Sequence, residues 1–227
     1  MTAAESRYAC SMQRRASSSR IPLWPKILYT LFVAVLVPVY WRHYGPANFL
    51  WASDIALFLL LAGLWLESAL PVSMMALAVL VPEILWILDF LARLLTGFEP
   101  DAFRGTRYMF DASVPGYLRA LSLYHLLLPG ILLWSLHRLG YDHRALVAQT
   151  LLCWVVFPVS YLVSSPQANI NYVFGFGSVP QAWMDEKLWV LFLMIAFPLL
   201  LYLPLHLLLK RLFGTPSVHP GVADTLP

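Results

Sequence analysis

The chain has 227 residues, of which 60% are hydrophobic and 12% are charged, and its mean hydropathy is +0.69. Soluble domains are usually about half apolar and about a quarter charged, so this composition excludes an ordinary soluble globular protein. The formal net charge is +3 and the basic residues are scattered along the chain, so no nucleic-acid partner is expected.

The apolar residues come in blocks of about 20, the length at which a helix crosses about 30 Å of hydrocarbon. We therefore expect an all-α, polytopic membrane protein, a bundle of six transmembrane helices. The predicted spans are 23–41, 49–67, 71–95, 117–137, 144–164 and 188–212. They form one domain, 23–212, between a mobile basic N-terminal tail (1–22) and a flexible C-terminal tail (213–227).

The first predicted span follows a basic tail, as the apolar part of a secretory signal would. Its run LWPKILYTLFVAVLVPVYW is too long for that, and no small-x-small cleavage pattern follows, so we interpret it as an uncleaved span. Cys10 lies in the tail and Cys153 in the fifth span. We therefore expect no disulfide and no thiolate metal site, and the sequence predicts no metal or other cofactor.

The basic residues near the span ends predict the orientation. Nine lysines and arginines lie on the side of the two termini and six on the other side. We therefore expect both termini in the cytoplasm of a bacterial cell, with the protein in the inner membrane. The two long loops, 96–116 and 165–187, then lie outside.

The second span begins within GPANFLWASDIALFLL, where Ser53 and Asp54 are adjacent polar residues in an apolar run. In one interpretation Ser53 caps the helix and Asp54 suits the positive end of its dipole. In the other, both line a reactive pocket. An ionisable side chain inside a span costs at least about 2.5 kcal/mol, so each such residue needs a reason to be there.

Further ionisable residues occur in the later spans. Glu83 lies in the middle of the third span, and His125 lies about two turns into the fourth; each could also be a hydrogen-bonded packing residue. Asp89 and Arg93 have the i,i+4 spacing of a structural ion pair. His206, near the inner end of the sixth span, is interpreted as an interfacial residue without chemistry.

In the six-span topology most of these polar residues fall in the outer half of the bilayer, beneath the two long loops. One loop carries NINYVFGFG, with Asn169 and Asn171 two residues apart. Gathering polar groups costs less than burying each against lipid separately. The sequence therefore predicts an outer-leaflet polar pocket, with membrane lipid as the partner, lined by Ser53, Asp54, Glu83, His125, Asn169 and Asn171.

Three stretches resemble a superfamily of six-span membrane lipid enzymes, which includes the androgen-induced protein 1 type fatty-ester hydrolases and the YwaF-like membrane acyltransferases. WASDIALFL is similar to their helix with a nucleophile near an Asp or Asn. LYHLLLPGILLW is similar to a later helix with a His and a Pro, and NINYVFGFGSVP to an Asn-x-Asn-aromatic loop. The chain also looks like a bacterial integral membrane-protein family through YGPANFLWASDIALF, RYMFD and NINYVFGFG.

The resemblance implies a lipid acyl hydrolase or acyltransferase in which Ser53 is the nucleophile, His125 the general base and Asn171 an oxyanion donor. The acyltransferases place a Cys where Ser53 stands, whereas the hydrolases use a Thr that falls nearer Trp51. Two other classes stay open. One is a non-enzymatic membrane accessory or lipid-binding protein, and the other is a small transporter, which the one-sided polar cluster disfavours. The sequence predicts no particular protein partner.

Overall fold

The computed structural model describes residues 19–97, 105–176 and 179–214, and these ranges contain helices and no strands. The main helices are α2 (Leu23–Tyr44), α3 (Ala52–Leu66), α4 (Ala69–Thr96), α6 (Tyr124–Leu139), α7 (Ala145–Val163), α8 (Glu186–Ala196) and α9 (Leu203–Phe213). Short elements connect them: the 3-10 turns η1 (Pro46–Leu50), η2 (Arg107–Met109) and η3 (Ile170–Tyr172), the helix α5 (Gly116–Ser122) and the π-helix η4 (Phe197–Tyr202).

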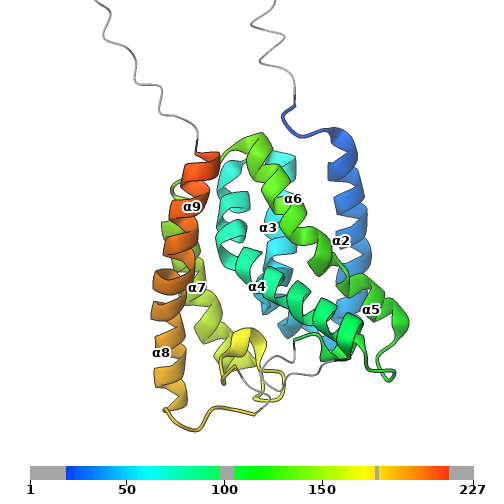
Figure 1. Cartoon of the computed structure of the whole chain (residues 1–227), viewed down its shortest axis with the longest axis vertical. Helices are drawn as coiled ribbons and strands as arrows, with labels where there is room; N and C mark the ends of the chain where they lie inside the picture. Colours follow the sequence, from blue (N-terminus) through cyan, green and yellow to red (C-terminus); the bar gives the residue numbers. More distant parts are fainter. Residues whose placement is uncertain (1–18, 98–104, 177–178, 215–227) are drawn as a thin grey trace, which may run out of the picture.

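The helices run alternately up and down in a bundle (Figure 1). α4 packs against α3, α6 and α7, and small residues on its buried face, such as Ala76 and Ala78, let these neighbours approach closely. The start of α2 and the end of α9 lie at the same end, which we call the terminal end (Figure 1). The opposite end, where α4 stops and η3 lies, we call the loop end.

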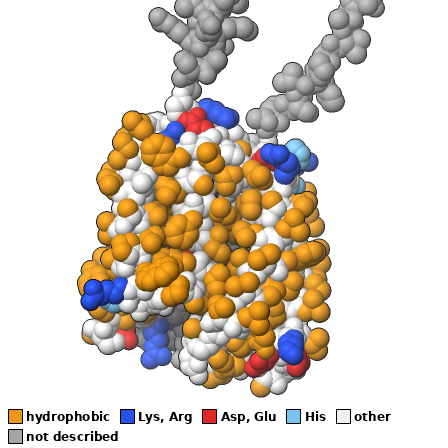
Figure 2. All heavy atoms as spheres, turned by 180° about the vertical axis from the view of Figure 1, so that it is seen from behind, with side chains coloured by type: hydrophobic (Ala, Val, Ile, Leu, Met, Phe, Trp, Pro, Cys, Tyr) orange, Lys and Arg blue, Asp and Glu red, His pale blue; other side chains and the backbone are white. Residues whose placement is uncertain are grey.

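Five helical stretches are long and apolar enough to cross a membrane: Leu23–Tyr44, Ala69–Thr96, Gly116–Leu139, Ala145–Val163 and Glu186–Phe213. Hydrophobic side chains cover the middle of the surface, and charged side chains lie near its two ends (Figure 2). Leu31, Leu127 and Leu162, on three different helices, are more than half exposed. A lipid environment would cover these side chains, so the structure is compatible with a multi-pass membrane protein.

The second predicted span is shorter than expected. Gly45 takes a positive φ of 77° after α2, and Pro46–Leu50 form the separate turn η1. As a result α3 begins at Ala52 rather than at residue 49 and has 15 residues. At 1.5 Å per residue it measures about 22 Å, less than the thickness of a bilayer core, so it is not among the five long helices.

The other predicted spans each correspond to a helical stretch in the structure, but two of them are composite. The fourth contains α5 and α6, which meet at Leu123. The last contains α8, the π-helix η4 and α9, with Pro198 inside the π-helical segment. Short π-helical segments within α-helices often mark functional or irregular positions, and no hydropathy pattern predicts them.

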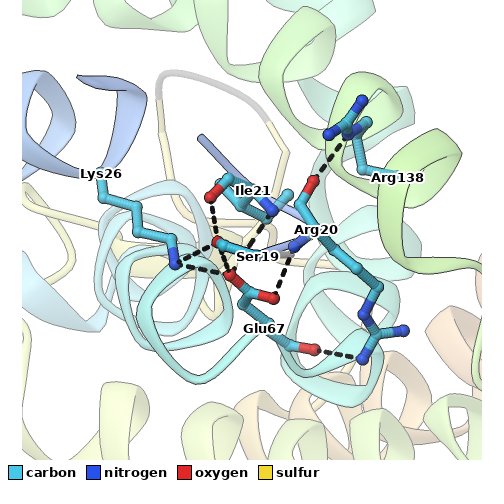
Figure 3. A network of polar contacts seen from close by, with 6 residues as sticks. All are labelled: Ser19, Arg20, Ile21, Lys26, Glu67 and Arg138. Carbon is cyan, nitrogen blue, oxygen red and sulfur yellow. Dashed lines mark hydrogen bonds and ion pairs between the residues drawn. The ribbon is translucent and has the colours of Figure 1, made fainter. Parts of the chain in front are cut away.

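The chain segment before α2 is held at the terminal end by Glu67, the left-handed residue that ends α3 (Figure 3). Its carboxylate binds Lys26 Nζ at 2.7 Å and accepts a hydrogen bond from the Arg20 N–H at 2.8 Å, and the Ser19 hydroxyl donates to it as well. Arg138, at the end of α6, donates to the Arg20 carbonyl at 2.7 Å. We call this network the Glu67 clasp.

The clasp shortens the predicted N-terminal tail. Residues 19–22 were expected to be mobile, but Ile21 is fully buried and Ser19 and Arg20 are hydrogen-bonded. The remainder of that tail, with Cys10, and most of the predicted C-terminal tail lie outside the described residues. Cys153 is buried with a free thiol.

Candidate functional site

The start of α3 is fixed by a loop residue that is distant in sequence. Asn171 accepts a hydrogen bond from the Ala52 N–H at 3.0 Å. Its Nδ2 donates to the Leu50 carbonyl at 2.7 Å and to Ser160 Oγ at 3.0 Å. The first N–H groups of a helix have no intrahelical partner, so the Asn171 side chain acts as a cap by accepting one of these hydrogen bonds. Both of its N–H groups are occupied, which removes the support for Asn171 as an oxyanion donor.

Asp54 lies in the first turn of α3 and points into the bundle, with 2% of its surface exposed. One carboxylate oxygen accepts a hydrogen bond from Asn48 Nδ2 at 2.9 Å, and the other accepts one from the Tyr124 hydroxyl at 3.4 Å. The helix begins at Ala52 with Trp51 in the N-cap position, and the Trp51 side chain makes no capping hydrogen bond. The interpretation of Ser53 as the capping residue is therefore wrong, and Asp54 is a buried residue of the bundle interior.

The predicted polar residues of α4 and α6 meet directly. His125 Nδ1 and Glu83 Oε2 lie 2.7 Å apart, and Glu83 is 3% exposed. Trp86 stacks on the imidazole with ring centroids 4.6 Å apart, and Tyr124 stacks with centroids 4.1 Å apart. The second ring nitrogen, Nε2, has no hydrogen-bond partner in the described parts of the chain, and it is not among the fully buried unpaired atoms. The imidazole is therefore fixed in orientation with one nitrogen available.

Tyr124 joins the two halves of the site, because its ring stacks on His125 while its hydroxyl reaches Asp54. The Ser53 side chain lies near the same hydroxyl. No hydrogen bond links Ser53 to His125 among the described contacts. The structure thus brings Ser53, Asp54, Glu83 and His125 to one region, but the predicted nucleophile–base contact is absent from the described contacts.

Further tyrosines surround this cluster at the loop end. The Tyr40 hydroxyl lies 2.8 Å from Ser122 Oγ, and Tyr108, in η2, lies near the same serine. Burial raises the pKa of Tyr108, so its hydroxyl stays protonated. The cluster therefore offers neutral O–H groups around two buried carboxylates.

Asp89 and Arg93 form an ion pair at 3.1 Å, with the i,i+4 spacing expected from the sequence. Both side chains are 4% exposed. The second carboxylate oxygen accepts hydrogen bonds from the Thr106 N–H at 3.1 Å and from its hydroxyl at 2.6 Å. Asp89 thus fastens the loop after residue 104 to α4, which is a structural role.

Two other predicted residues lie away from the cluster. Asn169 Nδ2 donates to the Gly175 carbonyl at 2.7 Å and its Oδ1 accepts from the Phe174 N–H at 2.9 Å. It shapes its own loop and does not line the predicted pocket. His206 Nδ1 lies 2.7 Å from the Tyr141 hydroxyl towards the terminal end, outside the site as expected.

Sequence reasoning missed Asn48, Trp86 and Tyr124. Tyr124 immediately precedes His125, and Trp86 follows Glu83 by three residues, which is about one helical turn. Aromatic residues this close to the ionisable ones were the available signal. No group of three or more potential metal-ligating side chains occurs within residues 19–97, 105–176 and 179–214. Comparison of the chain with protein-family models, with curated proteins and with solved structures finds no match.

Proposed function

We propose that the chain crosses the bacterial inner membrane six times with both termini in the cytoplasm. Five helical stretches have the required length, and η1 with α3 supplies a sixth apolar crossing from residue 46 to residue 66. An even number of crossings agrees with the start of α2 and the end of α9 lying together at the terminal end (Figure 1). The excess of basic residues on that side supports the orientation.

We infer that the site performs acid–base chemistry on a lipid ester, as a lipid acyl hydrolase or acyltransferase. The observation that carries this proposal is the Glu83–His125 pair, 2.7 Å apart, with Nε2 free. A carboxylate on Nδ1 selects the tautomer with Nε2 unprotonated and stabilises the imidazolium that forms when Nε2 takes a proton. Placed in the loop-end half of an apolar bundle, this base would meet a substrate that enters from the outer leaflet.

The chemistry follows from the free nitrogen. His125 Nε2 accepts the proton of a water molecule or lipid hydroxyl as its oxygen bonds to the ester carbonyl carbon. When the ester C–O bond breaks, the imidazolium returns that proton to the leaving alcohol. Glu83 keeps its negative charge throughout. Ser53 is not needed in this scheme, because no hydrogen bond joins it to His125 in the described contacts.

The test is incubation of the detergent-purified protein with mixed lipids, followed by mass spectrometry of released fatty acids and transferred acyl groups. We expect product from the parent and a loss of at least about 100-fold in His125→Gln, the usual range for removing a general base. If Ser53→Ala forms as much product as the parent, the nucleophile is water or a lipid hydroxyl. Reaction of the parent, but not of Ser53→Ala, with a serine-directed probe would restore the acyl-enzyme route.

A non-enzymatic lipid-binding role is the second candidate. The lack of a hydrogen bond between Ser53 and His125 in the described contacts favours it, because Ser53 is then not presented to the base. The buried carboxylates and aromatic rings would then hold a lipid head group. In this case mass spectrometry would find a copurified lipid that Glu83→Gln and Asp54→Asn remove, and no product would form in the incubation.

A further inference from the structure

A second feature of the molecule lies at the terminal end, where the loop between α6 and α7 meets the end of α9. The Tyr141 N–H donates to the Phe213 carbonyl at 3.0 Å, and the Tyr141 hydroxyl lies 2.7 Å from His206 Nδ1. These two contacts hold the loop against α9. Lys210 and His143 both lie close enough to His206 for their charges to act on it.

The cations of this region are unevenly paired. Arg144 is engaged with Asp142, the nearby carboxylate, through an Nη2–Oδ2 contact of 2.7 Å. His143, Lys210 and Arg211 are exposed and form no salt bridge or side-chain hydrogen bond with residues of the described ranges. Two permanent positive charges and one titratable imidazole are thus left without a countercharge in this part of the structure.

An apolar stripe on α9 begins directly beside these cations. Leu207, Leu208 and Leu212 are each more than half exposed, and they share one or two helical turns with Lys210 and Arg211. Figure 2 shows blue and pale-blue side chains, with a red one beside them, at the upper right, directly above the hydrophobic surface. A cationic rim above exposed leucines matches a molecule with an anionic head and apolar tails.

We propose that His143, Lys210 and Arg211 bind the phosphate of an anionic phospholipid of the inner leaflet, whose acyl chains lie along Leu207, Leu208 and Leu212. The site is separate from the Glu83–His125 pair and rests only on the membrane placement proposed above. Basic residues next to the membrane surface attract anionic lipids with about a fivefold gain in affinity for each charge. The ligand class is therefore a phospholipid with net negative charge.

The test uses the full-length protein in nanodiscs of equimolar phosphatidylcholine and phosphatidylglycerol, extracted into detergent for native mass spectrometry. We expect the parent to retain phosphatidylglycerol in preference to phosphatidylcholine. Lys210→Gln with Arg211→Gln should lower that retention by at least about fivefold, and adding His143→Gln should lower it further. The matched control is Arg42→Gln with Lys187→Gln, which removes two charges elsewhere and should lower the retention much less.

Three results would overturn the proposal. The first is equal retention in the parent and the Lys210/Arg211 variant, and the second is an equal loss in the control variant. The third is displacement of the lipid by excess inorganic phosphate alone, which would indicate a small-anion site. Failure of the parent to enter nanodiscs would instead refute the membrane placement and the lipid site together, whereas lipid retention without ester turnover would leave this site intact.

Discussion

The buried carboxylates of this bundle differ in the charge of their partners. Asp89 faces Arg93, whereas the hydrogen-bond donors to Asp54 are the neutral groups of Asn48 and Tyr124. A carboxylate satisfied by a cation costs less to bury than one that meets only neutral donors. Asp89 is therefore explained by its structural pair with Arg93. The burial of Asp54 needs another explanation, such as a role in the candidate site.

The Asp89–Arg93 pair allows a mutational prediction. Asp89→Ala removes the carboxylate that contacts the buried Arg93 guanidinium and leaves two Thr106 donors unpaired, so we expect a loss of about 3–5 kcal/mol in stability and a low folded yield. Arg93→Ala should cost less, since Thr106 still satisfies one oxygen of Asp89. Exchanging the two residues should restore the yield only in part, because Thr106 then lacks its acceptor. Thermal melts in detergent would show this order, and parent-like melting of both single variants would refute it.

The Glu67 clasp predicts a pH dependence at the terminal end. The Lys26 ammonium, followed by the Ser19 hydroxyl, lowers the pKa of Glu67 from its usual value near 4.5 to about 2. Because the folded value is the lower one, the stabilisation is complete above the unfolded pKa of about 4.5 and is lost as the pH falls towards about 2.

We therefore expect Glu67→Gln to melt below the parent at pH 7 and the two melting temperatures to converge as the pH is lowered from about 4.5 towards about 2. Thermal melts at a series of pH values would measure this difference. A difference that stays constant over the whole series would show that Glu67 acts through packing and not through its charge.

At the scale of elements, a glycine in α3 allows this helix to lie close to the start of α4. A Cβ at Gly63 would lie 2.7 Å from a methyl carbon of Val72, a distance at which one of the helices must move. Val72 is fully buried, so it has no room to yield. The absence of a side chain at Gly63 therefore allows α3 to pack tightly against the start of α4.

Gly63→Ala should therefore destabilise the protein by about 1–3 kcal/mol, the usual cost of overpacking. Gly130 in α6 is the matched control, because a Cβ there meets no atom within 4 Å. Gly130→Ala should be neutral or stabilising by up to about 1 kcal/mol through helix propensity. Chemical denaturation of both variants in one detergent tests the pair, and equal effects would contradict the close-contact explanation.

The elements also show what the sequence could and could not predict. Apolar block lengths predicted the helical stretches because each block needs one face for packing and one for lipid. The start of α3 could not be predicted this way, since the turn that begins at Pro46 continues to Leu50, inside the apolar run. The Glu83–His125 contact could be anticipated from matching depth along α4 and α6. The lack of a Ser53–His125 contact could not, because it depends on how the side chains pack between α3 and α6.

At the scale of the whole molecule, the six-crossing topology predicts which ends are accessible from outside the cell. Ser113, near the loop end, is exposed, and so is Arg144, near the terminal end. In a Cys10→Ser background, Ser113→Cys should react with an impermeant maleimide on intact cells, and Arg144→Cys only after the cells are opened. The reverse pattern would invert the orientation while leaving the helical bundle unchanged.

The central claim is that Glu83 and His125 act as one catalytic unit on a lipid ester, and a double-mutant cycle on product formation tests it most directly. Rates of fatty-acid release would be measured for the parent, Glu83→Gln, His125→Gln and the double variant. We predict that each single substitution lowers the rate by at least about 100-fold and that the double variant is no slower than the slower single one. Effects that multiply, or a parent rate no higher than that of the double variant, would contradict the account.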